Sequence, residues 1–434
     1  MLLRHYSRTI TTMPEPLSTQ SYKGVRDFYP ASMAMQQYIF DTWSETAERF
    51  GYERYDASVL EPAALYKAKG AENAEMVNDQ TYTFIDRGDR EVTLRPEMTP
   101  TVARMIAGKA KELAWPARWY SIPNLFRYER AQRGRLREHW QLNVDMFGAS
   151  DYTSDVEIIQ LAHQIFLDFG ASEDMFEILI NNRATMNHAY AALGITDADT
   201  VTAITRLNDR KDKITDEEYV TALTEITADA PLTAEIKAMI ESEDPGDNLV
   251  VATLRDLGIN NVRIDRALAR GFDYYTGTVF EFKDTHPDNN RALLGGGRYD
   301  NLTSLFGGEP ISGIGFGFGD VTMRDFLETH DLLPADVTFT APAVALLPLS
   351  PEQNLPAMQL AQDIRATGLS CSVDTTNRKI GKKIASAATA NVIYIITIGE
   401  DEVTSSTYTM KHLETGKDTS GTLAELMNSL TELG

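Results

Sequence analysis

The sequence predicts an α+β protein in which an antiparallel sheet flanked by helices fills about the first 330 residues and a small α/β domain follows. Three observations predict this fold. Short alternating strands and glycine-containing turns occur up to residue 182 and again from residue 275, an acidic helical stretch lies between them, and strand and helix alternate beyond residue 343. Hairpin-linked strands favour an antiparallel sheet, whereas regular strand–helix alternation favours a mostly parallel one.

The chain is expected to have four parts. These are a disordered tail over residues 1–20, a larger domain over 21–330, a linker over 331–342 and a smaller domain over 343–434. Within the larger domain we expect a helical insertion at about 185–260, because that stretch is acidic and poor in aromatic residues. The linker is predicted from its two prolines.

The elements of the larger domain follow from hydrophobic periodicity and turn residues. Its first half is expected to contain a helix over 30–50, a strand over 52–60, a hairpin over 81–94, a helix over 99–109, a strand running into a loop over 118–130, and a strand over 141–148. A helix over 153–170 should begin at Thr153 or Ser154 and close at Gly170. Strands are then expected over 176–182 and 275–283, with glycine-rich strand segments over 292–302 and 312–320.

The smaller domain has a simpler pattern. Strands are predicted over 343–349, 370–374 and 391–399, with helices over 351–368 and 379–390 between them. This order predicts a mostly parallel sheet.

The composition is that of an ordinary globular protein, with 434 residues, 43% hydrophobic and 24% charged. No stretch of 18 uninterrupted apolar residues occurs, so we expect no membrane span. The single cysteine, Cys371, excludes a disulfide framework and fits a cytoplasmic protein. The net charge of −22 argues against a non-specific nucleic-acid binder but leaves room for a local basic patch. The acid-free first dozen residues have a transit peptide as their alternative interpretation.

The densest charge feature lies at residues 127–137, where five arginines accompany one acid. Arginine presents a planar fork of donors that fits phosphate oxygens. The alternative is a solvated loop that offsets nearby acids. Because the run directly follows an apolar strand and turns at Gly134, it favours a loop aimed at a ligand.

Two further segments combine charged and aromatic groups. Arg95 to Thr99 ends a predicted strand, and its carboxylate beside a hydroxyl suits an ammonium group; a helix N-cap is the alternative. Arg270 to Tyr275 joins an arginine to two tyrosines, which suits an anion next to a flat ring; half-buried packing is the alternative.

Two glycine-rich segments allow close approach to a ligand. Gly295 to Asp300 contains three successive glycines, with a tight turn as the alternative reading. Gly313 to Asp320 has glycine at alternate positions, and a strand of this kind leaves one face bare for a planar group such as adenine. The spacing differs from that of a dinucleotide fingerprint, and no P-loop is present.

Other enzyme classes find little support. The seven histidines lack metal-binding spacing, no G-x-S-x-G elbow occurs, and Cys371 has no neighbouring histidine. We therefore assign no metal-binding residues in the protein itself.

Taken together, these segments resemble the histidyl-tRNA synthetases, a family of class II aminoacyl-tRNA synthetases. The matching motifs are KGVRDFYP (23–30), TLRPEMT (93–99), FRYERAQRGR (126–135), QLNVDMFG (141–148), ARGFDYYTGTVFE (269–281), GGGRYDNL (295–302) and GIGFGFGD (313–320), in the family's order. The C-terminal RKIGKKIASAATANVIYIITIGEDEV (378–403) is similar to the family's anticodon-binding domain. The resemblance covers about residues 20–434.

The resemblance implies a class II catalytic domain with a helical insertion and an anticodon-binding domain. It implies an ATP-dependent, AMP-forming ligase that converts L-histidine and ATP to histidyl-adenylate and pyrophosphate and then esterifies tRNA(His). It also implies Mg²⁺ on the outer phosphates, no editing domain, and a homodimer with residues 51–61 near the interface.

The resemblance also implies roles for individual residues. Arg127 and Arg270 would act on opposite sides of the α-phosphate, with Arg130 and Arg135 as candidates for the γ-phosphate and the tRNA 3′ end. The residues expected around histidine are Glu97, Thr99 and Gln141 for the ammonium, and Asp145, Tyr274, Tyr275 and Tyr299 for the imidazole region. Gly315, Gly317 and Gly319 would approach ATP. The residues expected to contact tRNA are Arg378, Lys379, Lys382 and Lys383.

The chain departs from the family pattern at four places. Ser58 replaces a usual proline, Asp145 a frequent glutamate, and Ala131 a frequent proline. Strict alignment puts Val321 and Thr322 where the third class II motif closes with Glu-Arg, and Arg324 would lie about 200° round a helix from the expected position.

Two alternative functions are compatible with a synthetase-like fold. One is a non-catalytic paralogue, such as the regulatory subunit of ATP phosphoribosyltransferase, and the other is a binding module that senses uncharged tRNA. The paralogue would lack the anticodon-binding domain and typically lose the active-site arginines, whereas this chain has residues 343–434, Arg127 and Arg270. The sensing module would tolerate loss of Glu97 and Arg270, and both are present.

Overall fold

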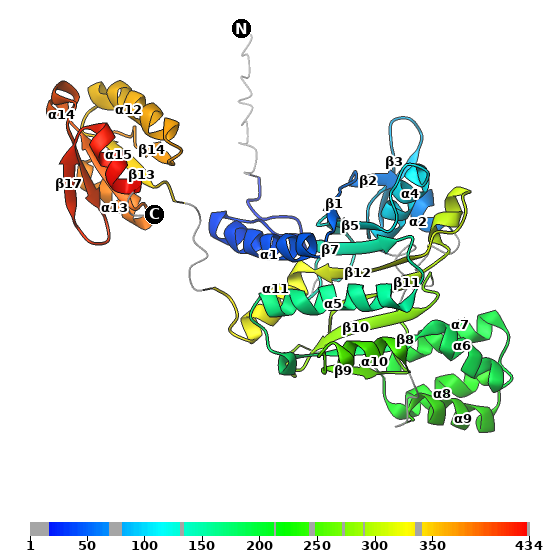
Figure 1. Ribbon diagram of the computed structural model, residues 1–434. Helices are drawn as coiled ribbons and strands as arrows, with labels where there is room; N and C mark the ends of the chain where they lie inside the picture. The colour runs from blue at the N-terminus through cyan, green and yellow to red at the C-terminus, as the bar shows by residue number, and fades with distance from the viewer. Residues whose placement is uncertain are drawn as a thin grey trace, which may run out of the picture. The chain divides into compact units, whose positions relative to one another are not determined.

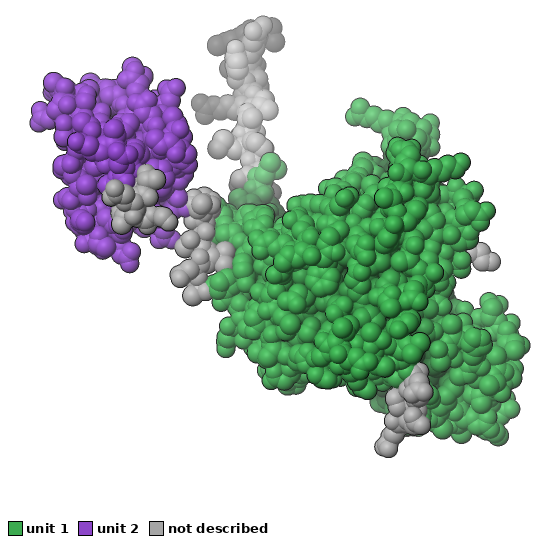
Figure 2. Space-filling model, in the orientation of Figure 1, with its two compact units in different colours: residues 1–335 green, residues 336–434 purple. Residues whose placement is uncertain are grey.

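The computed structural model describes residues 17–68, 80–130, 134–211, 214–242, 248–270, 274–289, 291–334 and 341–431. The chain divides into two compact units, Met1–Ala335 and Asp336–Gly434 (Figure 2). This division falls inside the range expected for the linker. Residues 335–340 of that linker, and the first 16 residues of the expected tail, lie outside the described residues.

A nine-stranded sheet forms the centre of the first unit (Figure 1). In sheet order its strands are β1 (Glu53–Arg54), β5 (Ala117–Ser121), β7 (Glu138–Phe147), β12 (Gly313–Gly319), β11 (Ala292–Tyr299), β10 (Thr278–Asp284), β8 (Phe176–Asn182) and β9 (Val262–Ile264), and β6 (Asn124–Phe126) pairs with β7. The six strands from β5 to β8 pair antiparallel, whereas the edge strands β1 and β9 pair parallel with their neighbours. The predicted antiparallel sheet is confirmed.

The main core lies between this sheet and four helices. These are α1 (Pro30–Arg49), α5 (Tyr152–Asp168), α10 (Leu249–Asp256) and α11 (Asp320–Thr329). Phe166 of α5 is fully buried and stacks on Phe176, Phe282 and Phe318, whose rings come from three different strands. The predicted cap of α5 at Thr153 or Ser154 is wrong: the N-cap is Asp151, whose side chain accepts from the Thr153 amide, and the helix begins at Tyr152.

The helical insertion has a core of its own. Its helices are α6 (Arg183–Ala192), α7 (Ala198–Asn208), α8 (Asp216–Thr227) and α9 (Ala230–Ile240), which Figure 1 shows as a separate bundle. At its centre Asn208 accepts a hydrogen bond from Tyr219 and donates one to Tyr190. Helix α10 packs instead into the main core through Val250, Val251 and Leu254, so the separate bundle ends before residue 249.

A three-stranded sheet joins β2 (Leu60–Pro62), β4 (Glu91–Leu94) and β3 (Tyr82–Ile85), beside α2 (Ala64–Lys67) and α4 (Thr99–Lys109). The single strand predicted over 52–60 is therefore wrong: β1 belongs to the large sheet and β2 to the small one. The predicted hairpin is confirmed, since Asp86 accepts from the Gly88 and Arg90 amides at its turn. Short 3-10 helices span Glu173–Met175 (η1), Leu302–Phe306 (η3) and Pro351–Gln353 (η4).

The second unit contains a five-stranded sheet in the order β14 (Cys371–Val373), β13 (Val344–Pro348), β15 (Tyr394–Ile398), β16 (Tyr408–His412) and β17 (Asp418–Gly421). Its helices are α12 (Asn354–Ala366), α13 (Ile380–Thr389), α14 (Glu400–Ser405) and α15 (Leu423–Thr431). The first three strands are parallel, as predicted. Strands β16 and β17 add an antiparallel hairpin that the sequence analysis did not identify. Nowhere in the described parts of the chain does a helix have the length and apolar character needed to cross a membrane.

A buried ion pair ties the core side of the sheet to α5. Arg298, from β11, pairs with Asp155, and its guanidinium also donates to Ser154 Oγ at 2.6 Å and to the Ala149 carbonyl at 2.9 Å. The side chains of Arg298 and Asp155 are only 8% and 4% exposed. Removing one member of such a pair leaves an uncompensated buried charge.

We predict that Arg298→Met lowers the free energy of unfolding of the first unit by about 3–5 kcal/mol. All four tryptophans lie between residues 43 and 140, so tryptophan fluorescence during denaturation reports this unit alone. The matched control is Arg263→Met, whose side chain is 52% exposed in its pair with Glu177 and should cost at most about 1 kcal/mol. Equal losses in the two variants would contradict the assignment.

Candidate active site

Glycines line one face of the large sheet on the neighbouring strands β11 and β12. Gly295 lies opposite Gly317, and Gly297 lies opposite Gly315, in the register between β11 and β12. Their neighbours Leu294, Phe316 and Phe318 point into the core on the other side. The alternation of strand residues therefore leaves this face without side chains over two adjacent strands.

Charged and polar side chains occupy the space above these glycines. A methyl group added at Gly295 would lie 2.1 Å from Arg270 Cζ, one at Gly315 would lie 2.4 Å from Asp145 Oδ1, and one at Gly317 would lie 2.7 Å from Gln141 Cδ. Real side chains do not tolerate such distances, so glycine is required wherever these groups lie flat on the sheet. Gly319 differs from these three glycines. It pairs with Gln141 at the end of β12 and is the N-cap residue of α11.

Arg270 is held in an uncommon backbone conformation, with φ of +57°. Its Nη1 donates to Glu281 Oε2 at 2.5 Å, and the side chain is 18% exposed. Its Nε is buried and has no hydrogen-bond partner among the described residues. A left-handed, non-glycine residue with an unsatisfied donor is typical of a ligand-binding position. Residues 271–273 lie outside the described residues.

Glu97 lies just before α4 and is almost completely buried. Its Oε2 accepts from the Tyr274 hydroxyl at 3.1 Å, whereas its Oε1 is buried without a partner in the described structure. Burial raises the pKa of Glu97 to about 7, although the Arg127 charge and the Tyr274 hydrogen bond oppose the rise. Burial and the Glu97 charge raise the pKa of Tyr274 well above its ordinary value, and hydrogen bonding with Thr99 opposes this.

Asp145 repeats the pattern of Glu97. Its Oδ1 accepts from the Tyr299 hydroxyl, and its Oδ2 is buried without a partner among the described residues. Burial raises the pKa of Asp145 to about 7 against the Tyr299 hydrogen bond. Each of the two carboxylates thus has one oxygen held by a tyrosine and one oxygen available to a donor from a ligand.

Arg127 and Arg270 each lie near a buried side chain of this site. Arg127 donates from Nε to the Pro96 carbonyl at 2.8 Å, and its charge acts on Glu97. Tyr275 lies near Arg270, Glu97 and Asp145. Burial raises the pKa of Tyr275 to about 12, the charge of Arg270 opposes this rise, and the charges of Glu97 and Asp145 add to it. Segments far apart in sequence thus converge on Tyr275.

The remaining arginines of the predicted loop are more exposed. Arg135 pairs with Glu129 through Nη1 and Oε2 at 3.2 Å and is 48% exposed. Arg130 is exposed, and residues 131–133, including the departure at Ala131, lie outside the described residues.

Sequence reasoning missed a buried network at the start of α11. Asp320 is 1% exposed and accepts from Arg26 at 2.6 Å, from Gln36 at 2.8 Å and from the Trp140 amide at 3.0 Å. It also missed His139, next to Trp140 on β7; burial, with the charges of Arg127 and Arg26, lowers its pKa to about 3 and keeps its ring neutral. An acid directly after the last glycine of the glycine-rich strand was the available signal for Asp320.

The basic residues of the second unit divide into two kinds. Lys379 and Lys382 are exposed at the start of α13, and Arg378 is exposed while paired with Asp374 at 2.9 Å. Lys383 is 3% exposed, and its Nζ donates to the Pro348 and Asp374 carbonyls, both at 2.8 Å. The expectation that Lys383 contacts tRNA is therefore corrected: its ammonium is committed to the fold.

A metal site made by the protein alone would need several ligating side chains close together. No group of three His, Cys, Asp or Glu side chains in the described part of the chain could hold a metal ion. Mg²⁺ is usually held by phosphates and water with one or two carboxylates, so an ion that arrives with a nucleotide needs no such cage.

Comparisons with known proteins agree with this arrangement. The profile of the family described as histidyl-tRNA synthetase matches residues 24–319, and that of the anticodon binding domain matches residues 343–433. Proteins named histidine–tRNA ligase from Leptospira biflexa and Thermoplasma volcanium are 39% and 34% identical, covering 96% and 95% of this chain and 98% of each relative. The solved histidyl-tRNA synthetase from a Nostoc species has the same fold, with a TM-score of 0.75 at 21% identity over 96% of this chain and 100% of its own. The chain belongs to the histidyl-tRNA synthetase family.

Proposed function

We propose that this chain is an ATP-dependent histidine–tRNA ligase that forms histidyl-adenylate and transfers histidine to tRNA(His). The observation that carries the proposal is that Glu97 and Asp145 are buried and each keep one oxygen without a partner among the described residues, and that both act with Arg270 on the buried Tyr275. The curated relatives in Leptospira and Thermoplasma bear the same activity in their names.

In this proposal the two carboxylates recognise histidine. Glu97 Oε1 accepts from the α-ammonium, with Thr99 and Gln141 nearby, and Asp145 Oδ2 accepts from an imidazole N–H. Both oxygens are buried, so an amino acid without the matching donor would leave one unpaired. A site built in this way rejects analogues strongly without an editing domain.

The adenylation step needs positive charge rather than acid–base groups. A carboxylate oxygen of histidine forms a bond to the α-phosphorus, the bond to the pyrophosphate oxygen breaks, and negative charge grows on the α-phosphate oxygens. Arg127 and Arg270 stabilise this charge from two sides, and the unpartnered Nε of Arg270 is available to do so. Mg²⁺ bound to ATP would neutralise the outer phosphates.

In the transfer step a terminal ribose hydroxyl of tRNA attacks the histidyl carbonyl, and AMP leaves. The arginine loop would lie near the acceptor end, and the exposed Arg378, Lys379 and Lys382 would contact the anticodon stem. Unpaired bases would then be read at both ends of the RNA.

We also propose a cytoplasmic homodimer. An apolar pocket beside β2, lined by residues that include Pro62, Leu65, Leu302 and Phe306, supports contact with a second copy at this side. The non-catalytic paralogue and the tRNA-sensing module are less favoured, because the chain keeps Glu97, Arg270 and a match to the anticodon-binding domain, and its relatives are named histidine–tRNA ligase.

We predict that Arg270→Ala lowers the rate of histidine-dependent ATP–pyrophosphate exchange by at least about 10²-fold, the cost of a lost charge-stabilising donor. Gly295→Ala should act in the same direction without removing a charge, since its methyl group would overlap the Arg270 guanidinium. Gly108→Ala is the matched control, because a methyl group there meets open space. A near-normal rate in Arg270→Ala would remove this residue from the mechanism.

Glu97→Gln should have opposite effects on stability and on binding. The raised pKa means that ionised Glu97 costs folding free energy above pH 7, a cost that fades as the pH falls toward 4.5. At pH 8 we therefore expect a higher unfolding midpoint without ligand, together with a KM for histidine raised at least about tenfold by the lost charged hydrogen bond. Glu91→Gln, at an exposed site, is the control. A less stable variant with an unchanged KM would contradict both roles.

Charge reversal at both Lys379 and Lys382 should raise the KM for tRNA by roughly tenfold, because phosphate contacts dominate RNA affinity. Histidine-dependent exchange should not change, since it needs no RNA. Lys417→Glu is the control at another exposed position of the second unit. Equal losses in both assays would argue against a role confined to RNA binding.

A further inference from the structure

The position that aligns with the arginine of the third class II motif offers no cation. Thr322 stands there, and its hydroxyl donates to the Leu293 carbonyl at 2.9 Å and to the Gly319 carbonyl at 3.0 Å. Arg324, two residues later, pairs through Nε with Glu328 at 2.7 Å on the exposed side of α11. Both side chains are committed to partners within the protein, so a cation for a ligand at this position would come from elsewhere in the fold.

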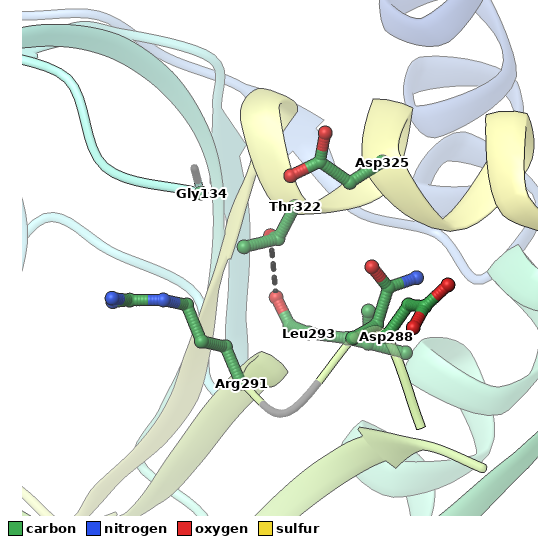
Figure 3. A pocket seen from close by; sticks show the side chains of 7 residues that line it. Gly134, Asp288, Arg291, Leu293, Thr322 and Asp325 are labelled. Carbon is green, nitrogen blue, oxygen red and sulfur yellow. Dashed lines mark hydrogen bonds between the residues drawn. The ribbon is translucent and has the colours of Figure 1, made fainter. Parts of the chain in front are cut away.

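A pocket at this place has an arginine in its wall. The pocket is lined by residues from the start of β11, from α11 and from the loop over residues 127–137. They are Gly134, Asp288, Asn289, Arg291, Leu293, Thr322 and Asp325. Figure 3 shows the Arg291 side chain extending beneath Gly134 and away from the carboxylates of Asp288 and Asp325.

Contacts place Arg291 against the tip of the arginine loop. A methyl group added to Gly134, whose φ is +73°, would lie 3.0 Å from Arg291 Cδ. The loop is anchored to the site, since the Arg127 amide donates to the Arg137 carbonyl at 2.9 Å. Arg291 also precedes Gly295, the residue beneath Arg270, by four positions, roughly 13 Å of extended strand.

The Arg291 guanidinium forms no ion pair with a carboxylate of the described residues. Among the described residues its guanidinium has no hydrogen bond or ion pair, and partial burial together with the charge of Arg135 lowers its pKa while Glu129 opposes this. Glu129 is already paired with Arg135. The carboxylates of Asp288 and Asp325 line the same pocket, and Figure 3 shows the Arg291 side chain extending away from both. The donors of the Arg291 guanidinium therefore stay available to a phosphate oxygen.

We propose that Arg291 binds the terminal phosphate of ATP and supplies the cation that Thr322 lacks. This inference rests on the proposed function, because it assumes that ATP lies with its α-phosphate between Arg127 and Arg270. Arg291 belongs to none of the motifs that carry the family resemblance. The alternative ligand of the same cation is a phosphate of the tRNA acceptor end.

Arg291→Gln, Arg291→Lys and the control Arg324→Gln separate these possibilities. Calorimetric titration should show Arg291→Gln binding ATP roughly tenfold or more weakly, the effect of a lost charge-assisted hydrogen bond, and AMP within about twofold of the parent protein. Unchanged AMP binding also shows that the site is folded. Arg291→Lys should retain part of the ATP affinity, and Arg324→Gln all of it.

Three results would overturn the assignment: unchanged ATP affinity in Arg291→Gln, an equal loss for ATP and AMP, or a rise in the KM for tRNA with ATP affinity unchanged. Failure of the proposed function looks different. In that case the parent protein itself would show no histidine-dependent exchange, whereas failure of this inference alone leaves that exchange intact and its ATP dependence unaltered in Arg291→Gln.

Discussion

The active site depends on the absence of side chains on one face of β11 and β12. Because Gly295, Gly315 and Gly317 carry no Cβ, a guanidinium, a carboxylate and an amide lie directly on the sheet, each where a methyl group would come within 2.7 Å or less. The opposite face of the same strands carries the large side chains of the main core. One pair of strands therefore separates a dry, packed layer from a floor shaped for a ligand.

Above this floor the protein keeps polar groups unsatisfied. Glu97 and Asp145 are buried, each has one oxygen without a partner in the part of the chain that the structure describes, and burial raises the pKa of both to about 7. Such groups lower the stability of the empty protein and gain their missing partners when a ligand with matching donors binds. The tyrosines that hold the other two oxygens fix the direction of the free ones, and in the proposed function this direction determines which donors of a ligand they accept.

Much of this arrangement could be predicted from the sequence, because alternating glycines and alternating apolar residues have a period that strands share. The antiparallel sheet, the hairpin and the parallel core of the second unit follow that logic. The meeting of Arg127 with Arg270 at one phosphate comes from the family resemblance instead, and it stays a prediction. Features set by tertiary contacts could not be predicted. Lys383 is a charged residue that the sequence suggests is exposed, yet its ammonium donates to two backbone carbonyls. Residues 52–60 look like one strand, yet they divide between two sheets. Arg291 shows no sequence signal, since only the fold brings it to Gly134.

The measurement that tests the account most directly is ATP–pyrophosphate exchange by the full chain with each of the twenty amino acids in turn. Two buried carboxylate oxygens positioned for two separate donors predict that histidine supports exchange and that the other nineteen are slower by ~10⁴-fold. Exchange that is as fast with another amino acid, or absent with histidine, would contradict the account.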